Sequence, residues 1–451
     1  MEKEVVNYRF DEATIDVATT ISLNGGTVYL VGGAVRDMLL GVEPHDLDYC
    51  ITGISEEKMV ELFPKAKKQG KDFPVFIING CEYALARAER KVGEKHTDFE
   101  ILTSPELSIE DDLRRRDLTI NAMAIDVLSH ELIDPFDGRE DLKNGTIRKV
   151  SEAFIEDPLR AYRVARFAAK MGFTVAADTI QSLMDMKGSI ENLSRESVFA
   201  EFRKALLTEH PEVFFDVLKQ AGLLEVHFKE IYDLIGVEQP AEYHPEGDAY
   251  NHTMEVLREV ARRTPNVKVG SDEELTRFGA LVHDLGKALT PRELWPHHYG
   301  HEERGEEPIR SLCQRIRAPF SFEKAGICTS KVHMNLGKYK SLKPKTKMKM
   351  FAEIAKAKSI SYKGEEIIAR VDSKDDSISF AEVAQEVMSM QSTPEMREKC
   401  TTEGVLDFEK LKTKIYESRI ARLKEIEKAQ NPTPVSLANI SANCEKIIPK
   451  E

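Results

Sequence analysis

The stretch from Tyr29 to Cys50, YLVGGAVRDMLLGVEPHDLDYC, constrains the fold more than any other part of the chain. An apolar run of strand-forming residues ends in Gly32 and Gly33, and the helix-like segment AVRDMLLG follows directly. Glycines let the backbone approach a phosphate, and the start of a helix attracts anions. The pattern therefore predicts a strand-turn-helix unit that can hold a phosphate group.

Two aspartates follow this helix and begin the next predicted strand. Residues two apart on a strand point to one face of the sheet, so Asp46 and Asp48 should project together. Paired carboxylates suit Mg²⁺ bound with substrate phosphates, and Arg36 lies one turn into the helix, within reach of the same triphosphate. Either motif alone is more often a strand-turn-helix junction with surface acids. Their combination favours a site for a nucleoside triphosphate and its metal ions.

The rest of the chain changes from mixed to helical patterning. Strand-like runs continue through FPVFIING and EYALARAE to a hairpin formed by INAMAIDV and ELIDPFDG. From about Asp157 the apolar residues repeat at helical spacing. We therefore expect an α+β fold, in which a mixed β-sheet head precedes an all-α neck and body, and a weakly structured segment over the last ~20 residues. The predicted domains are a head (1–150), a helical neck (151–235), a further helical domain (236–380) and a helical tail (381–451).

Composition argues against several classes of protein. The 451 residues carry a formal net charge of −13, unlike a general nucleic-acid coat protein. Nine lysines nevertheless occur from Lys331 to Lys358 against one acid, Glu353, a run that would either hold a polyanion or form a solvated helix face. No apolar run is long enough to span a membrane, the acidic N-terminus lacks a secretion signal, and the six cysteines are scattered. These features predict a cytoplasmic protein without membrane contact.

Two charged segments follow the first strands. In EDDLRRRDLTINAMA, Arg116 and Asp117 precede a strand-like stretch, which predicts that they lie near the edge of the sheet. In EDPLRAYRVARF, an acid and three arginines recur every three residues and would form one charged stripe on a helix: Asp157, Arg160, Arg163 and Arg166. An aspartate and an arginine one turn apart offer acceptors and donors to the edge of a nucleobase. An amphipathic helix with an internal salt bridge is the alternative.

Histidines and acids form a second constellation. His283 and Asp284 are adjacent on a predicted helix, with His252 upstream and Asp372 downstream, although two further aspartates near Asp372 leave that choice open. Imidazoles and carboxylates together suit a transition metal or Mg²⁺, which would activate water toward a phosphoester. An isolated histidine is more often structural, but four others are candidate extra ligands: His297, His298, His301 and His333.

In their order and separation these motifs resemble one family. VGGAVRD, HDLDYC, RRDLTINA, DPFDG and EDPLRAYRVARF are similar to the class II tRNA nucleotidyltransferase and poly(A) polymerase family. GKDFPVF, EYALARAERK and LCQRIRAP resemble in particular the bacterial CCA-adding enzymes with an HD domain, of the gamma-proteobacterial type. The resemblance extends from about Val28 to near Ile420. It implies template-independent addition and repair of the 3′-terminal CCA of tRNA with CTP and ATP, by two-metal in-line transfer.

The resemblance also implies a role for each matching residue. Two catalytic Mg²⁺ ions would be held by Asp46 and Asp48. The triphosphate and ribose would be bound by Gly33, Arg36, Arg116 and Asp117. The Watson–Crick edge of CTP or ATP would be read by Asp157 and Arg160, with the nucleotide site completed by Arg163 and Arg166.

For the second constellation the resemblance implies a metallohydrolase of the H…HD…D type. Its ligands would be His252, His283, Asp284 and Asp372, and its metal a divalent transition metal such as Ni²⁺. The implied activities are phosphatase, 2′-nucleotidase and 2′,3′-cyclic phosphodiesterase. The segments TSKVHMNLGKYK and VDSKDDSISF depart from the pattern expected of the family.

Three other functions fit parts of the pattern. A poly(A) polymerase shares the head but would ignore CTP. An HD nucleotide hydrolase would use the head only to bind a nucleotide, and a non-catalytic RNA-binding protein would use the lysine run. The expected partners are the tRNA 3′ end, ATP and CTP, and both a monomer and a homodimer remain open.

Overall fold

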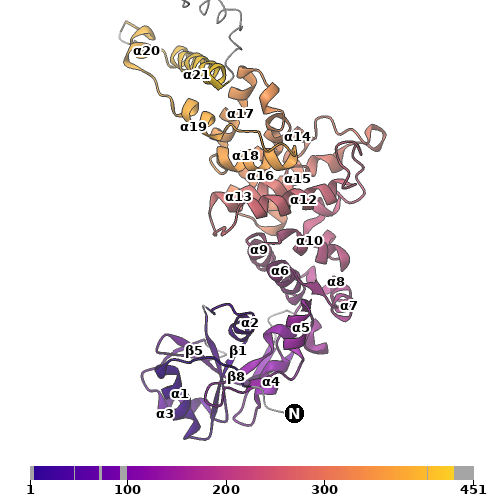
Figure 1. Cartoon of the computed structure of the whole chain (residues 1–451), viewed down its shortest axis with the longest axis vertical. Helices are drawn as coiled ribbons and strands as arrows, with labels where there is room; N and C mark the ends of the chain where they lie inside the picture. The colour runs from indigo at the N-terminus through magenta and orange to yellow at the C-terminus, as the bar shows by residue number, and fades with distance from the viewer. Residues whose placement is uncertain (1–4, 45, 71–73, 92–98, 404, 431–451) are drawn as a thin grey trace, which may run out of the picture. The chain divides into compact units, whose positions relative to one another are not determined.

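Figure 1 shows the computed structural model of the chain, which describes residues 5–44, 46–70, 74–91, 99–403 and 405–430. The chain divides into two compact units, one of residues 1–235 with 314–318 and one of residues 236–313 with 319–451. The segment predicted to be weakly structured lies mainly at 431–451, outside the described residues. The domain boundaries at 150, 235 and 380 stay predictions.

The first unit begins with a mixed seven-stranded sheet in the order β3-β4-β5-β2-β1-β8-β9. β1 runs antiparallel to both β2 and β8, while β2 and β5 are parallel. The hairpin predicted from INAMAIDV and ELIDPFDG is present as β8 and β9. A mixed sheet followed by helices confirms the expected α+β fold. The strands are β1 (Thr27–Val31), β2 (Asp48–Thr52), β3 (Lys67–Gln69), β4 (Val75–Ile78), β5 (Cys81–Leu85), β8 (Ala124–Asp126) and β9 (Leu132–Ile133).

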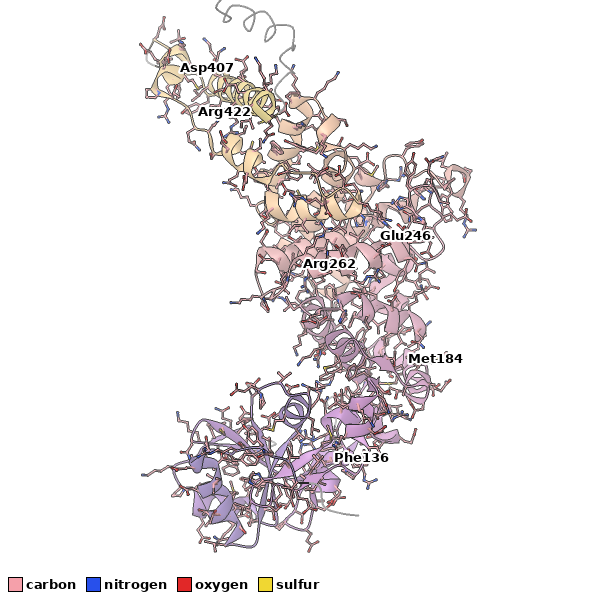
Figure 2. The ribbon with its side chains drawn as sticks, in the orientation of Figure 1. Phe136, Met184, Glu246, Arg262, Asp407 and Arg422 are labelled. Atoms are coloured by element: carbon pink, nitrogen blue, oxygen red, sulfur yellow. The ribbon has the colours of Figure 1, made fainter. Side chains whose placement is uncertain are left out.

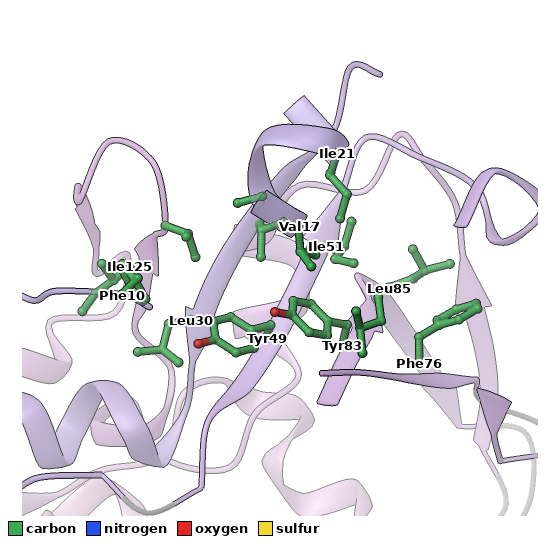
Figure 3. Packing of buried hydrophobic residues seen from close by; sticks show 14 of the residues in the cluster. Phe10, Val17, Ile21, Leu30, Tyr49, Ile51, Phe76, Tyr83, Leu85 and Ile125 are labelled. Atoms are coloured by element: carbon green, nitrogen blue, oxygen red, sulfur yellow. The ribbon is translucent and has the colours of Figure 1, made fainter. Parts of the chain in front are cut away.

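Helices cover both faces of this sheet, because its strands bury alternate side chains in opposite directions. On one face, Val17 and Ile21 of α1 (Glu12–Ser22) are buried with Tyr49 and Tyr83, whose rings stack 4.8 Å apart (Figure 3). The opposite face packs Cys50 against α4 (Ile109–Arg114). The arginine-rich segment that follows α4 is thereby held at the sheet. The other helices of the head are α2 (Gly33–Leu39), α3 (Glu56–Leu62) and α5 (Gly138–Lys143).

Two predicted strands were wrong in detail. EYALARAE is divided between β5 and a separate hairpin of β6 (Arg87–Lys91) and β7 (Phe99–Thr103). The first half of INAMAIDV is instead the 3₁₀ turn η1 (Thr119–Asn121), and β8 begins only at Ala124. The Asn121 amide donates to Asp117 Oδ1 at 3.3 Å, a local side-chain hydrogen bond of the kind that competes with strand pairing.

The rest of the first unit is mainly helical, and α6 packs on α9 and α10. α6 ends at Met171, and Gly172 follows it with a left-handed φ of 66°, which suits the residue after a helix. Buried aromatic rings, among them Phe202, Phe214 and Phe228, fill the space between these helices. The elements are β10 (Thr146–Ile147), η2 (Glu152–Glu156), α6 (Arg160–Met171), β11 (Thr174–Val175), α7 (Ala177–Asp185), α8 (Lys187–Ile190), α9 (Arg195–Leu206), α10 (Pro211–Gln220) and α11 (Leu224–Tyr232).

Tyr162 makes a buried polar contact in this aromatic core. Its hydroxyl lies 2.6 Å from His227 Nδ1, and burial lowers the pKa of His227 to about 4, so the imidazole is neutral at pH 7. Tyr162→Phe would leave a buried imidazole nitrogen without a partner and should lower the free energy of unfolding by about 1–3 kcal/mol. Urea unfolding followed by circular dichroism measures this. Tyr232→Phe, at an exposed tyrosine, is the matched control and should change little.

The second unit is a helical domain built around α13, which contacts α12, α16 and α18. Gly279 allows this close packing, because a Cβ there would lie 2.6 Å from Thr329 Oγ1. The elements are α12 (Ala249–Arg263), α13 (Asp272–Val282), η3 (Leu285–Leu289), η4 (Arg292–Leu294), α14 (His301–Arg304), α15 (Glu306–Ile316), α16 (Phe320–Leu336), η5 (Tyr339–Ser341), α17 (Pro344–Ala357), α18 (Tyr362–Asp372), α19 (Ala381–Ser389), α20 (Pro394–Lys399), β12 (Thr401–Thr402), β13 (Val405–Leu406) and α21 (Phe408–Gln430).

The helix predicted to carry both His283 and Asp284 ends earlier than expected. α13 stops at Val282, and Asp284, at φ −105° and ψ 7°, leads into the 3₁₀ turn η3. Gly286 in this turn lies against α14 so closely that a Cβ would be 2.0 Å from the His301 carbonyl oxygen. The change of helix type therefore brings the Asp284 and His301 segments together.

Candidate nucleotide and metal sites

The turn between β1 and α2 requires glycine. Gly32 has a φ of 73°, which favours a residue without a side chain, and a Cβ there would lie 2.8 Å from Arg116 Nη1. The backbone N–H of Gly32 donates to the Met123 carbonyl at 3.3 Å, which fixes the turn against the segment before β8. The glycine therefore leaves room for a guanidinium beside the predicted phosphate-binding turn.

Asp48 lies at the same end of the sheet as this turn. It begins β2 and pairs with Val31, the last residue of β1. The prediction that both aspartates begin this strand is wrong for Asp46, which is exposed in the preceding loop. Asp48 is exposed at the surface, but the protein around its carboxyl group displaces part of the water and raises its pKa. The Arg116 guanidinium lowers this pKa in part, and the Asp46 carboxylate raises it. Two carboxylates that disfavour each other's charge are a fitting donor set for a divalent cation.

Asp112 of α4 aims two arginines at this end of the sheet. Its side chain is 1% exposed, and its Oδ1 accepts from Arg115 Nε and Nη2 at 3.0 and 2.7 Å. Its Oδ2 accepts from Arg116 Nε and Nη2 at 3.3 and 3.1 Å. Arginines held by such charge-assisted bonds are pre-organised for an anion. The sequence analysis missed Asp112, because nothing distinguishes it from the adjacent acids of EDD.

A second set of contacts ties α6 and α2 to the same segment. Asp117 Oδ2 accepts from Arg163 Nε and Nη2 at 2.7 and 2.6 Å. Burial raises the pKa of Asp117, but the Arg163 guanidinium outweighs it and holds the pKa below its ordinary value. Arg36 donates to the Asn121 side-chain oxygen at 2.5 Å and lies 5.5 Å from the centre of the Phe167 ring. These side chains form one connected network rather than a set of solvated charges.

The predicted charged stripe on a helix is wrong in one respect, since Asp157 lies before α6. Its φ of −109° and ψ of 101° are extended, as expected for a residue that precedes a proline, Pro158. Asp157 Oδ2 is still 4.0 Å from Arg160 Nε. Arg160 Nη2 donates to the Arg115 carbonyl at 2.7 Å, and Arg166 Nε donates to Glu201 at 2.5 Å.

These groups surround a cleft of about 620 Å³ in the first unit. Eight cationic side chains and three carboxylates line it, so it favours a polyanion. Of the predicted nucleotide and Mg²⁺ residues, all but Asp46 lie in its wall. The sequence analysis did not single out Phe167, Lys170 or Arg87. The wall consists of Gly32, Gly33, Arg36, Asp48, Arg87, Arg115, Arg116, Asp117, Asn121, Asp157, Leu159, Arg160, Arg163, Arg166, Phe167 and Lys170.

In the second unit, the four residues predicted as HD ligands converge. His252 Nε2 lies 3.0 Å from Asp372 Oδ1 and 3.7 Å from Asp284 Oδ2. His283 Nε2 lies 3.2 Å from Asp284 Oδ2 and 3.5 Å from Asp372 Oδ1. Burial lowers the pKa of His283, but the two carboxylates raise it to about 10, so this pocket strongly favours a positive charge.

Two of the four extra histidines join the cluster. His301 Nε2 and His333 Nε2 lie 3.1 and 3.5 Å from Asp284 Oδ1, and 3.1 Å from each other. His297 does not belong to it, and His298 donates from Nε2 to the Glu238 carbonyl at 2.8 Å. The sequence could not show which histidine of the turn WPHHYGHEER joins the cluster, because the turn offers three candidates.

The histidine tautomers make the cluster fit for metal ions. His283, His301 and His333 place Nδ1 2.7 Å from a backbone carbonyl oxygen, which requires the proton on Nδ1. In the neutral form of each ring, Nε2 then carries a lone pair and faces the carboxylate, and on His283 a cation would take the place of the proton that the two carboxylates favour. Asp284 is 1% exposed, and besides these imidazoles its Oδ2 lies 2.6 Å from Lys287 Nζ. A buried carboxylate whose oxygens face several imidazole nitrogens matches the ligand chemistry of a divalent transition metal.

Comparisons with known proteins match both units of the chain. The profile of the poly A polymerase head domain matches residues 28–148, that of the probable RNA and SrmB-binding site of polymerase A matches 172–234, and that of the HD domain matches 249–407. A multifunctional CCA protein from Mannheimia succiniciproducens is 46% identical over 333 residues, which are 72% of this chain and 78% of that protein. The chain belongs to the multifunctional CCA protein family. This confirms the family predicted from the sequence, including its gamma-proteobacterial, HD-bearing type.

Solved structures share the fold of this multifunctional CCA family member. The Thermotoga maritima CCA-adding enzyme complexed with tRNA_CCA has a TM-score of 0.62 and 18% identity, covering 96% of this chain and 100% of that one. A CCA-adding enzyme in complex with ATP has a TM-score of 0.63 and 19% identity, covering 97% of this chain and 100% of that one. At these identities the likeness concerns the fold alone.

The lysine run of this family member is not a uniform basic face. Lys347 of α17 is buried and donates to Glu427 at 2.7 Å, and Lys331 pairs with Glu306 at 2.5 Å. Lys345, Lys349 and Lys356 of the same helix are exposed. In the part of the chain that the structure describes, no helix has the length and apolar character needed to cross a membrane.

Proposed function

We propose that this chain adds and repairs the 3′-terminal CCA of tRNA, using CTP and ATP, and that its cleft of about 620 Å³ is the transferase site. The observation that carries the proposal is the meeting of the glycine turn, Asp48, the Arg115–Arg116 pair and the start of α6 in one cationic wall. The residues fit Mg²⁺, which Asp46 and Asp48 would hold. When bound, the metal ions supply charge neutralisation at the triphosphate and activation of the RNA 3′-hydroxyl.

The arginines of the wall bind and orient the triphosphate. Arg116 and Arg36 lie closest to the glycine turn, and Asp112 and Asn121 restrict their motion. A triphosphate held in this way presents its α-phosphorus to the hydroxyl in a fixed direction, which removes much of the entropy cost of the reaction. Asp117 and Arg163 extend the contacts toward the ribose.

Asp157 and Arg160 select the base. Together they offer an acceptor and several donors at the start of α6, a combination suited to the Watson–Crick edges of cytosine and adenine. Asp157→Ala should weaken this selection, so that incorporation of UTP relative to CTP rises by at least about tenfold, the effect of one lost hydrogen bond to a charged group. Single-turnover incorporation of each nucleotide into trimmed tRNA measures the ratio. Asp178→Ala, at an acid of α7 outside the cleft wall, is the control.

Incubation of a tRNA lacking CCA with CTP and ATP, followed by sequencing of the products, tests the transferase function. We expect one CCA per molecule, and CMP addition when CTP is given alone. A poly(A) polymerase would ignore CTP and extend with adenylate, and a protein whose head only binds nucleotide would add nothing.

The second proposed function is a metal-dependent phosphohydrolase in the HD domain. Asp284 lies between two sets of imidazoles, and its oxygens face different sets. His252, His283, Asp284 and Asp372 would hold one cation, and His301 and His333 would hold another with the remaining oxygen of Asp284. The metal ions would activate water for attack on phosphomonoesters and 2′,3′-cyclic phosphates at RNA ends. Ni²⁺ is a suitable ion for an imidazole-rich set.

A further inference from the structure

A carboxylate outside the metal-ligand set contacts one of the ligands directly. Glu246, labelled in Figure 2, lies in the loop before α12 and its side chain is 9% exposed. Its Oε1 accepts from His252 Nδ1 at 2.6 Å and lies 3.0 Å from His244 Nδ1. Its Oε2 lies 3.2 Å from Lys374 Nζ. The proposed roles of the HD cluster do not use these three contacts.

His252 differs from the other imidazoles of the cluster in what holds its Nδ1. His283, His301 and His333 use backbone carbonyls, whereas His252 uses a carboxylate. A negatively charged acceptor fixes the ring in the same tautomer and also makes its Nε2 a stronger donor to a metal. His252 Nε2 faces Asp372, so the strengthened nitrogen points into the cluster.

Lys374 gives this contact a second function. It lies two residues after Asp372, the last residue of α18, and its Nζ contacts Glu246 in the loop before α12. The Glu246 carboxylate therefore joins the segments that carry His252 and Asp372. Loss of the carboxylate would remove this connection between the two segments as well as the partner of His252 Nδ1.

We infer that Glu246 is a positioning residue for His252, with Lys374 as its counter-ion, and that it sets the metal affinity of the HD cluster. The inference rests on the proposed phosphohydrolase function. One alternative is that Glu246 is itself a ligand, together with His244 and His252, whose donor atoms could also hold an ion. His252 Nδ1 would then have to lose the proton that its contact with Glu246 requires.

Binding of Ni²⁺ to the full-length chain tests the inference. We would use the Asp46→Ala, Asp48→Ala background, so that the head contributes no metal site, and measure both affinity and stoichiometry by competition with a chromogenic chelator. Glu246→Ala should weaken binding by about 10–100-fold at unchanged stoichiometry. Glu246→Gln keeps an acceptor oxygen and should lose less than Glu246→Ala. Glu255→Ala, on the next turn of α12 and facing the cleft beside His252, is the matched control and should bind as the background does.

Each outcome decides between the alternatives. Affinity equal to that of the background in Glu246→Ala would overturn the inference, and so would a lower number of ions bound, which would make Glu246 a ligand. A melting temperature in excess EDTA that matches the background shows that the variant folds; if Glu246→Ala does not fold, Glu246→Gln carries the comparison. If His252→Ala binds Ni²⁺ as tightly as the background, the proposed HD metal centre itself fails, which is a different result.

Discussion

The Asp46→Ala, Asp48→Ala double variant should lose CMP and AMP addition to trimmed tRNA by at least about a thousandfold. Metal ions at a phosphoryl-transfer site stabilise the transition state by several kcal/mol, and each 1.36 kcal/mol changes the rate tenfold. Removal of both carboxylates leaves a cleft wall with eight cationic side chains and two acids, Asp117 and Asp157. Nucleotide binding should therefore survive better than catalysis, since the arginines remain.

Single-turnover rates and CTP affinity, measured separately, check this expectation. The signature is a large fall in the rate of addition with at most a small change in the CTP dissociation constant. Asp126→Ala, at an acid on strand β8 of the same sheet, is the control. Addition at the wild-type rate by the double variant would refute the assignment of the transferase metal site. Hydrolysis of 2′,3′-cyclic AMP by the same variant should persist, because Asp46 and Asp48 lie in the first unit and the HD cluster lies in the second.

The first strand, the glycine turn and the place of Asp48 at the start of the next strand could be predicted because they are local. A strand that ends in two glycines needs only its own residues to turn, and the φ of Gly32 is the conformation that such a turn requires. The edges of elements were less predictable. Asp157 was expected on a helix, but Pro158 forces it into an extended conformation, a rule that the sequence already contained.

The residues that hold the sites together could not be found from the sequence. Asp112 is one of three consecutive candidates in an acidic run, and only the packing of α4 on the sheet decides that it faces Arg115 and Arg116. Glu246 and Lys374 are 128 residues apart and meet through the fold of the second unit. Their roles depend on tertiary contacts, for which a single sequence carries no periodic signal.

The Asp284→Asn variant should abolish metal-dependent hydrolysis and keep CMP addition. Asparagine preserves the volume of the side chain but removes the charge that both sets of imidazoles face. Burial favours the neutral form of His283, and the Asp284 charge opposes this effect. Without that charge the pKa of His283 should fall from about 10 toward its ordinary value. A cation would lose its shared carboxylate for the same reason.

Hydrolysis of 2′,3′-cyclic AMP with added Ni²⁺, and the number of Ni²⁺ ions retained after dialysis, measure the effect of Asp284→Asn. We expect a loss of activity of at least about a hundredfold. Loss of a residue that only hydrogen-bonds a metal ligand costs about 10–100-fold, and loss of the ligand itself should cost no less. Asp233→Asn, at an exposed salt bridge with Lys229 in the first unit, is a control for a general loss of charge. Asp284 contacts both imidazole sets through different oxygens, whereas His333→Ala removes a ligand from one set only. The loss of Asp284 should therefore lower the number of retained ions further than His333→Ala does. Equal retention by the two variants would mean that the cluster holds a single ion.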